Sequence, residues 1–209
     1  PEESAALDAM FAAAAAAKPQ LDEITREIAA KFGATPVIPP KLKGRARSLD
    51  KMRADYAGDA TKLKDLARST IEARSLPQAK AIAAEVSRRF GIAPKRNLFE
   101  ENPVDGYRDA LFNLVIDGHT VEMQVHVPEV LQTKEYLHQA YVVRTGVERK
   151  AKEANRAPTD AEWMKIDRMN RIMRTAYNKA LGLDPDLGAT PAELARRADQ
   201  AGSAGTNSS

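Results

Sequence analysis

Alternating apolar and polar positions predict a β-hairpin in the middle of the chain. Residues 111–116 and 120–127 are two apolar-rich runs joined by Asp117-Gly118, and Asp-Gly between such runs is a strong hairpin signal. Because successive side chains of a strand point to opposite faces, the second run gathers its polar side chains on one face: Glu122, Gln124 and His126. A carboxylate, an amide and an imidazole on one face of a strand indicate a catalytic floor rather than a core.

Apolar spacings of three and four residues, together with capping signals, predict helices on both sides of the hairpin. Pro19 is expected to interrupt an alanine-rich first helix, and Gly33 to end its continuation. Two capping boxes, Ser75-Leu-Pro77-Gln78 and Thr159-Asp-Ala-Glu162, each open a helix. The predicted helices cover about residues 3–17, 19–32, 44–56, 75–90, 128–153, 159–181 and 190–199.

The rest of the pattern completes a mixed fold. Prolines between residues 36 and 40 predict an extended passage, residues 64–71 predict a further strand, and residues 92–99 predict a strand or loop. Helices around a central β segment predict an α+β domain with a mixed central β-sheet flanked by helices. We expect this domain to span residues 1–182, and residues 183–209 to form a polar tail that is partly disordered from Gly202 onward.

Composition constrains the partners more than the function. The 209 residues carry a formal net charge of +3 and a sequence pI of about 9.1, which favours anionic partners such as nucleotides or RNA. The absence of cysteine excludes disulfides and thiolate sites. No apolar run approaches the roughly 20 residues that span a bilayer, so we expect no membrane partner. Acidic residues precede the alanine-rich segment, which argues against a signal peptide. The chain starts at Pro1, so we expect a fragment of a longer protein.

A basic cluster is the first candidate for chemistry. Residues 41–51 hold five cations, and the preceding prolines and Gly44 keep Lys41 and Lys43 outside regular helix. Such a cluster can clamp a triphosphate, because fixed positive charge offsets the charge that shifts during phosphoryl transfer. The alternative is a solvated basic helix face, which is common.

Two carboxylates form the second candidate. Asp65 lies within a strand-like run, where aspartate is atypical, and its oxygens suit Mg²⁺. Glu122 on the neighbouring hairpin would complete a two-carboxylate metal site. The alternatives are an aspartate bonded to nearby backbone at a strand start, and a glutamate on the solvent face of a half-exposed sheet.

Aromatic and basic side chains after the two carboxylates form a third candidate. Gly106-Tyr107 can present a ring on which a base stacks, although a half-buried strand aromatic is the alternative. Four polar side chains follow at spacings of four, three and three, which places them on one face of a single predicted helix: Lys134, His138, Tyr141 and Arg144. An ordinary polar helix face is the alternative there.

These pieces, in this order, resemble the synthetase domain of the RelA/SpoT family, the alarmone (p)ppGpp synthetases. The resemblance covers about residues 40–145. On the donor side, Lys41-x-Lys43 with Lys51-Met52 resembles the segment that holds ATP phosphates, and Asp65-Leu66 resembles the Mg²⁺-binding aspartate. On the acceptor side, Gly106-Tyr107-Arg108 resembles the motif whose tyrosine stacks on the acceptor base. The strand Glu122-Met-Gln124-Val-His126 resembles Glu-Ile-Gln-Ile-Arg/His, and His138-Gln-Ala-Tyr141 resembles His-Trp-Ala-Tyr.

The resemblance implies a Mg²⁺-dependent pyrophosphokinase that transfers pyrophosphate from ATP to the 3′-hydroxyl of a purine nucleotide. The catalytic residues it implies are Asp65, Glu122 and Gln124, with Mg²⁺ held by Asp65 and Glu122. The implied ATP-binding residues are Lys41, Lys43, Arg47, Lys51 and Arg68. The implied acceptor-binding residues are Arg96, Tyr107, Asn113, His126, His138 and Tyr141.

Departures from the family pattern concern mainly the acceptor side. Lys41 and Pro103 replace an arginine and a lysine, Leu111 stands where a histidine is usual, and the strand arginine has moved to Arg68. The acceptor is therefore open among GDP, GTP and adenine nucleotides. With the missing hydrolase and regulatory domains, the departures favour a growth-inhibiting, toxin-like member. Such a member acts in the cytoplasm as a secreted effector delivered into a target cell, and it has an immunity or antitoxin protein as partner.

Three alternatives remain at this point. The same chemistry can be directed to the 3′ end of tRNA, for which Lys95-Arg96 and the basic face of residues 164–179 would bind phosphates. The chain can also be a catalytically inactive nucleotide-binding module that kept the fold, or a helical adaptor whose charges are only solvated.

Overall fold

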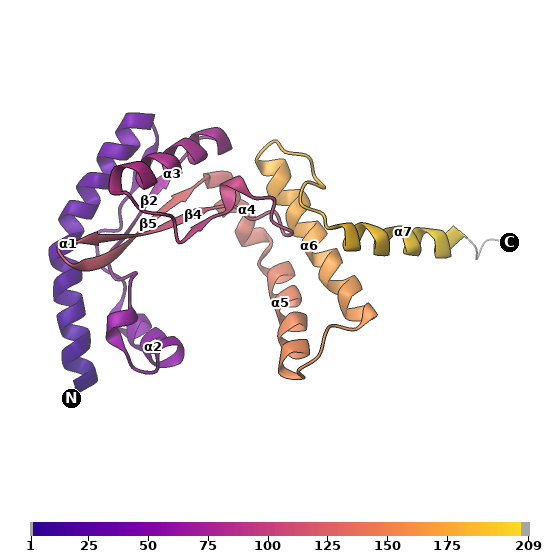
Figure 1. Cartoon of the computed structure of the whole chain (residues 1–209), viewed down its shortest axis with the longest axis horizontal. Coiled ribbons are helices and arrows are strands. Elements are labelled where there is room, and N and C mark those ends of the chain that lie inside the picture. The colour runs from indigo at the N-terminus through magenta and orange to yellow at the C-terminus, as the bar shows by residue number, and fades with distance from the viewer. Residues whose placement is uncertain (1, 206–209) are drawn as a thin grey trace. The chain divides into compact units, whose positions relative to one another are not determined.

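A computed structural model of the chain describes residues 2–205, with side chains described for residues 4–201. It divides into two compact units, which are described separately (Figure 1). The first unit comprises Pro1–Glu100 and Asp109–Pro128, and the second comprises Glu101–Arg108 and Glu129–Ser209. The predicted domain boundary after residue 182 stays a prediction.

The first unit is a mixed five-stranded sheet with helices, as predicted. Its strands are β1 (Thr35–Val37), β2 (Arg68–Glu72), β3 (Arg96–Asn97), β4 (Ala110–Ile116) and β5 (His119–His126), in the order β1-β2-β5-β4-β3. β2 and β5 are parallel, and the other neighbours are antiparallel. Its helices are α1 (Glu2–Phe32), α2 (Arg45–Tyr56) and α3 (Leu76–Phe90), with short 3₁₀ turns η1 (Ala60–Lys62) and η2 (Leu98–Glu100).

The predicted hairpin forms and separates an apolar face from a polar one. Asp117 and Gly118 both have positive φ, 50° and 77°, which suits a two-residue hairpin turn. α1 and α3 pack against the sheet, and the strand residues of the core are all almost fully buried: Ile71, Phe112, Leu114, Val121, Met123 and Val125. Alternate residues of β2 and β5 point to the other face, which carries Glu122, Gln124 and His126.

Pro19 does not interrupt the first helix, so that prediction was wrong. α1 runs without a break from Glu2 to Phe32 with Pro19 inside it. An internal proline costs about 3 kcal/mol, and burial offsets this cost. The buried stripe of α1 continues on both sides of the proline, with Ala14, Ala17, Leu21, Ile24 and Ile28 each at most 6% exposed.

Other boundaries in the first unit also differ from prediction. β2 begins at Arg68 rather than at residue 64, so Asp65 lies in the irregular segment before the strand. β1 and β3 are the two short edge strands, where the sequence predicts an extended passage at β1 and a strand or loop at β3. Ser75 caps α3 by accepting from Gln78 N, but Gln78 Oε1 accepts from Arg74 N, so only half of that predicted capping box forms.

The second unit is helical. It contains most of α4 (Pro128–Tyr136), then α5 (His138–Glu153), α6 (Asp160–Ala180) and α7 (Pro191–Gly205). α5 and α6 form an antiparallel pair (Figure 1). The Thr159–Glu162 capping box that opens α6 is present in full. None of the described helices is both long and apolar enough to cross a membrane.

Two predictions in the second unit need correction. The single helix predicted for residues 128–153 is broken at Leu137, whose φ of −91° and ψ of 0° are not helical. Leu137 is 8% exposed, and its burial favours a bend there. The sequence gives no signal for this helix break, because no glycine or proline lies beside Leu137. α7 continues to Gly205, beyond the predicted end near Asp199 and into the segment expected to be disordered; residues 206–209 lie outside the described residues.

Candidate active site

Asp65 lies at the centre of a charged cluster in the first unit. Its Oδ2 accepts hydrogen bonds from Lys43 Nζ at 2.6 Å and from Lys51 Nζ at 3.0 Å. Its Oδ1 is buried and has no hydrogen-bond partner among the described residues. The hydrogen-bond partners of Asp65 are therefore lysine side chains and not nearby backbone groups.

Backbone contacts bring these residues together from separate parts of the sequence. Lys43 N donates to Leu66 O at 2.9 Å, which ties the segment before α2 to the segment before β2. Gly44 is the N-cap of α2, and Lys51 follows about two turns into that helix. Both lysines therefore meet one carboxylate, although only one of them is helical.

The two lysines hold Asp65 in its ionised form. Burial alone raises the pKa of the Asp65 carboxyl, but the hydrogen bonds and charges of Lys43 and Lys51 outweigh burial and lower the pKa below its usual value. Burial also lowers the pKa of the Lys51 ammonium, and Asp65 and Tyr56 together outweigh it, so that this pKa is raised. Near neutral pH Asp65 is therefore a carboxylate and Lys51 an ammonium group.

Glu122, Gln124 and His126 form a hydrogen-bonded strip along β5. Gln124 Nε2 donates to Glu122 Oε1, and Gln124 Oε1 lies 2.8 Å from His126 Nε2. Glu122 N donates to Ala67 O at 3.0 Å, so the glutamate lies beside the segment that carries Asp65. The three side chains thus share the predicted face, and Gln124 forms hydrogen bonds with both of the others.

Arg68 and Asn113 flank Glu122 on the same face of the sheet. Arg68 is the β2 partner of Glu122, and Asn113 is its β4 partner. Arg68 lies two residues before Thr70, where the family pattern has its arginine, and a shift of two residues along a strand keeps the same face. The displaced arginine therefore still points to the sheet face that carries Glu122. Asn113 Oδ1 is buried without a hydrogen-bond partner in the described part of the chain.

The remaining predicted residues of the first unit are placed less centrally. Lys41 and Arg47 are exposed, and the ion pairs of Asp65 are made by Lys43 and Lys51 instead. Arg96 forms a two-point pair with Asp109, with Nε to Oδ1 at 2.7 Å. Any acceptor contact by Arg96 must therefore share its guanidinium with Asp109.

Tyr107 lies in the second unit, on a turn rather than on a strand. Tyr107 N donates to Asp105 Oδ1 at 3.1 Å, and Asp105 Oδ2 accepts from Arg144 at 3.1 Å. The Tyr107 ring has the edge of Tyr177 at 5.7 Å between centroids and Lys134 Nζ at 4.9 Å from its centroid. This ring is held from two sides, as expected for a platform rather than a mobile surface side chain.

The other residues predicted to bind the acceptor begin the next helix. His138 is the first residue of α5, and Tyr141 follows one turn later with the Arg144 guanidinium 5.5 Å from its ring centroid. Lys134 belongs to α4, so the predicted single face of one helix is wrong. Both His138 and Tyr141 are exposed.

Two arginines of the second unit are buried, which the sequence alone did not predict. Arg108, read as part of a nucleotide motif, is 1% exposed and donates to Gly106 O and to Asn178 Oδ1. Arg174, read as part of an RNA-binding face, is 0% exposed and pairs with Glu193. Both arginines therefore hold the structure together, and neither is available to a phosphate. Their spacing along the chain gave no signal of this.

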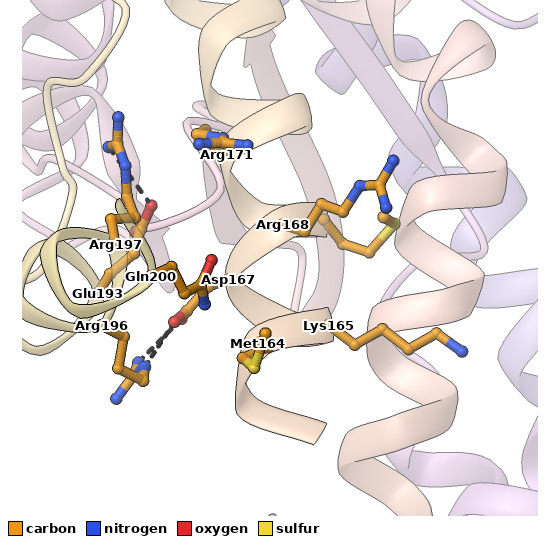
Figure 2. Close-up of a pocket in the computed structure, with 10 residues that line it drawn as sticks. Met164, Lys165, Asp167, Arg168, Arg171, Glu193, Arg196, Arg197 and Gln200 are labelled. Carbon is orange, nitrogen blue, oxygen red and sulfur yellow. Dashed lines mark hydrogen bonds and ion pairs between the residues drawn. The ribbon is translucent and has the colours of Figure 1, made fainter. Parts of the chain in front are cut away.

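A groove of about 420 Å³ between α6 and α7 is lined by several cations, of which the two on α7 are ion-paired (Figure 2). Arg196 is paired with Asp167 across the two helices, at 2.6 and 2.9 Å, and Arg197 donates to Asp186 at 3.1 Å. Arg168 and Lys165 extend away from α7 in Figure 2. The α7 side of the groove is therefore an ion-paired contact within this unit.

The residues present fit a Mg²⁺ ion completed by phosphates. Within the described residues no group of three or more His, Cys, Asp or Glu side chains could hold a metal, so a site supplied wholly by the protein is not formed there. Mg²⁺ in phosphoryl-transfer sites needs only one or two carboxylates, because water and substrate phosphates supply the rest. The buried Oδ1 of Asp65 and the half-buried Glu122 meet that requirement.

Comparison with known proteins finds a relative that matches part of the chain. No protein-family model matches the chain. The chain is 35% identical over 133 residues to the (p)ppApp synthetase toxin Tas1 of Pseudomonas aeruginosa (strain UCBPP-PA14), a match that covers 60% of this chain. It spans only 28% of the length of Tas1.

A solved structure shares the fold. The Type VI effector Tas1, in the crystal structure of its complex with its immunity protein, matches with a TM-score of 0.59 and 23% identity, over 84% of this chain and 96% of that chain. The small alarmone synthetase 1 of Bacillus subtilis is more distant, with a TM-score of 0.48 and 12% identity over 82% of this chain and 92% of that chain.

The relative and the shared fold agree with the resemblance to RelA/SpoT synthetase domains that the motifs of the sequence carry. The chain is similar to the toxin Tas1 in sequence over 133 residues, and it shares the fold of the Tas1 structure.

Proposed function

We propose that this chain is a pyrophosphokinase that transfers the β,γ-pyrophosphate of ATP to the 3′-hydroxyl of a purine nucleotide. The observation that carries the proposal is the Asp65 carboxylate, which is held by Lys43 and Lys51 at 2.6 and 3.0 Å beside the Glu122 strip. A carboxylate with a buried, unused oxygen next to ordered ammonium groups suits a metal–triphosphate better than it suits a structural ion pair.

The reaction needs charge stabilisation and positioning more than covalent chemistry. The 3′-hydroxyl oxygen of the acceptor attacks the β-phosphorus of ATP, the bond from that phosphorus to the α–β bridging oxygen breaks, and AMP leaves. Glu122, directly or through a water that it orients, accepts the hydroxyl proton. Gln124 fixes the Glu122 carboxylate by its hydrogen bond and links it to His126.

The donor phosphates are assigned to the cations of the first unit. Lys43 and Lys51 lie next to Asp65, and the exposed Lys41, Arg47 and Arg68 can reach phosphate oxygens from the solvent side. Mg²⁺, held by Asp65 and Glu122, would supply Lewis-acid neutralisation of the phosphate oxygens. The protein's own part is to keep the Asp65 carboxylate ionised through its two lysine partners and to fix the Glu122 carboxylate through Gln124.

An adenine nucleotide is the acceptor that the comparisons favour, because Tas1 is a (p)ppApp synthetase toxin. Tyr107 would take the base by stacking, and Asn113, His126, Arg96, His138 and Tyr141 are proposed as further acceptor contacts. GDP and GTP remain acceptors to be tested. The 3′ end of tRNA has less support, since Arg174 of the proposed RNA-binding face is buried.

A growth-inhibiting effector is the biological role that fits best. Tas1 is a Type VI effector that was crystallised with its immunity protein. We propose that this chain likewise acts in the cytoplasm of a target cell and that an immunity protein neutralises it.

The test is label transfer from γ-labelled ATP by Glu122→Gln, with Glu72→Gln as the matched control. Glu72 lies on the same face and is the β2 partner of His126, so both variants lose one carboxylate from one face. Glu122→Gln is expected to lose transfer by at least about 100-fold, because the proton acceptor and a metal ligand are removed. Glu72→Gln is expected to keep it. Transfer at an ordinary rate by a folded Glu122→Gln protein contradicts the proposal.

A further inference from the structure

The turn that carries Tyr107 rests directly on the backbone of α6. Gly106 has φ of +77°, and a Cβ there would lie 2.8 Å from Arg174 Cα and 3.3 Å from Tyr177 Cβ. Gly106 N also donates to Pro103 O at 2.9 Å, which closes the turn. Only a glycine allows this approach, so the position of Tyr107 depends on that of α6.

Arg174 connects this turn to α7. Its Nη1 donates to Val104 O at 2.8 Å and to Glu193 Oε2 at 2.9 Å, and its Nη2 donates to Glu193 Oε1 at 2.7 Å. Arg174 is 0% exposed and Glu193 is 1% exposed. One guanidinium therefore holds a carbonyl of the turn and the first turn of α7 at the same time.

Loss of either partner would disturb this arrangement more than loss of an exposed pair. An arginine in a protein stays charged, so Arg174 without Glu193 would be a buried charge lacking its main compensation. The side chain gains most by moving toward water. That movement withdraws the hydrogen bond from Val104 O and shifts the surface on which Gly106 packs.

We propose that the Arg174–Glu193 ion pair is a positioning device that holds Tyr107 in the orientation that receives the acceptor base. Tyr177 supports the same ring with its edge at 5.7 Å, and it lies one turn after Arg174 on α6. Helix α7 is therefore part of the support of the acceptor platform, although the sequence places it in a polar tail. This inference rests on the proposed function, because it takes Tyr107 as an acceptor contact.

The experiment compares Glu193→Gln with Asp167→Asn. Each neutralises a carboxylate that pairs α6 with α7, but the Asp167 pair with Arg196 has no hydrogen bond to the turn. Measured quantities are the KM for the acceptor nucleotide, the KM for ATP, and amide hydrogen exchange of residues 104–108. Glu193→Gln is expected to raise the acceptor KM by about 10- to 100-fold, as small misplacements do, to leave the ATP KM within about 2-fold, and to speed exchange in the turn. Asp167→Asn is expected to change none of these.

Unchanged acceptor KM and unchanged exchange in a folded Glu193→Gln protein overturn the inference, as does an equal rise in both KM values. If Glu193→Gln does not fold, Glu193→Asp keeps the charge and shortens the arm by one methylene. The same selective rise in the acceptor KM is then expected, and its absence overturns the inference. If the unaltered protein transfers no label, the proposed function fails, and the exchange comparison alone decides whether Glu193 holds the turn.

Discussion

Replacing Asp65 with asparagine removes the charge around which Lys43 and Lys51 are arranged, while it keeps the shape of the side chain. Two charge-assisted hydrogen bonds are lost or weakened, at 2.6 and 3.0 Å. The two ammonium groups then face one another without a shared anion.

The magnitude follows from the distances and the burial of the partners. A hydrogen bond to a charged group contributes roughly 1.5–3 kcal/mol. The lysine side chains are 15% and 30% exposed, so both can turn toward water, and the asparagine oxygen still accepts one bond. The free energy of unfolding should therefore fall by about 1–3 kcal/mol in total, which lowers Tm by about 2–4 °C for each kcal/mol.

The effect on the reaction should be larger than the effect on stability. Asp65 is proposed to hold the metal that neutralises the transferring phosphates, and removing one such electrostatic contact costs about 100- to 1,000-fold in rate, or about 2.7–4.1 kcal/mol of activation free energy. The assay is transfer of label from γ-labelled ATP at saturating Mg²⁺, read beside thermal unfolding of the same sample.

The matched control is Asp50→Asn, which makes the same change at an exposed site one residue before Lys51 in α2. It should change neither rate nor Tm by much. A folded Asp65→Asn protein that transfers label within a few-fold of the unaltered rate would refute the reasoning, because the carboxylate would then have only a structural role.

Three further predictions follow from other features of the structure. Changing Lys41 and Arg47 together to glutamine should weaken ATP binding measured by calorimetry, and the loss of affinity should be larger at low salt than at high salt. The Tm should stay unchanged, because both side chains are exposed. An unchanged affinity for ATP would exclude both residues from the ATP site. Gly106→Ala should lower the free energy of unfolding, measured with denaturant, by about 2–5 kcal/mol. The alanine would have to adopt a left-handed backbone conformation, and its Cβ would lie 2.8 Å from Arg174 Cα. A loss smaller than about 1 kcal/mol would contradict this prediction and show that the turn can rearrange around the added methyl group. Burial, with the nearby Asp105 charge, raises the pKa of Tyr177 to about 12. The stability contributed by this shift is fully present below the unfolded pKa of 10 and is lost as pH rises from about 10 to 12. Tyr177→Phe should therefore lose less free energy of unfolding over that interval than the unaltered protein, and an identical loss would exclude this cause.

The hairpin could be predicted because its signals are local. The Asp117-Gly118 turn and the period-two alternation of β5 are enough to set the register, and the register places Glu122, Gln124 and His126 on one face. The contact between Gln124 and both neighbours follows from that face alone.

The cluster around Asp65 needed more than the pattern. Lys43 and Asp65 are brought together by a backbone bond from Lys43 N to Leu66 O, and no periodicity announces such a contact. Only the resemblance to a known family joined these motifs. The strand expected to contain Asp65 begins at Arg68 instead, since the lysine partners and not a strand partner fix the aspartate.

Tertiary burial overrode local preference elsewhere. Pro19 is tolerated within α1 because buried residues on both sides hold the helix against the sheet. The Arg174–Glu193 pair could not be foreseen, because an arginine on a polar-looking helix and a glutamate in the first turn of another both look solvated. Only packing decides that both are buried.

The most direct test of the central claim is to incubate the unaltered protein with γ-labelled ATP, Mg²⁺ and, separately, AMP, ADP, GDP, GTP and tRNA, and to separate the products. The account predicts Mg²⁺-dependent label on the 3′ position of a free purine nucleotide, with adenine acceptors preferred. Label found only on tRNA would contradict the proposed acceptor class. Measurable ATP binding without label on any acceptor would contradict the proposed activity itself.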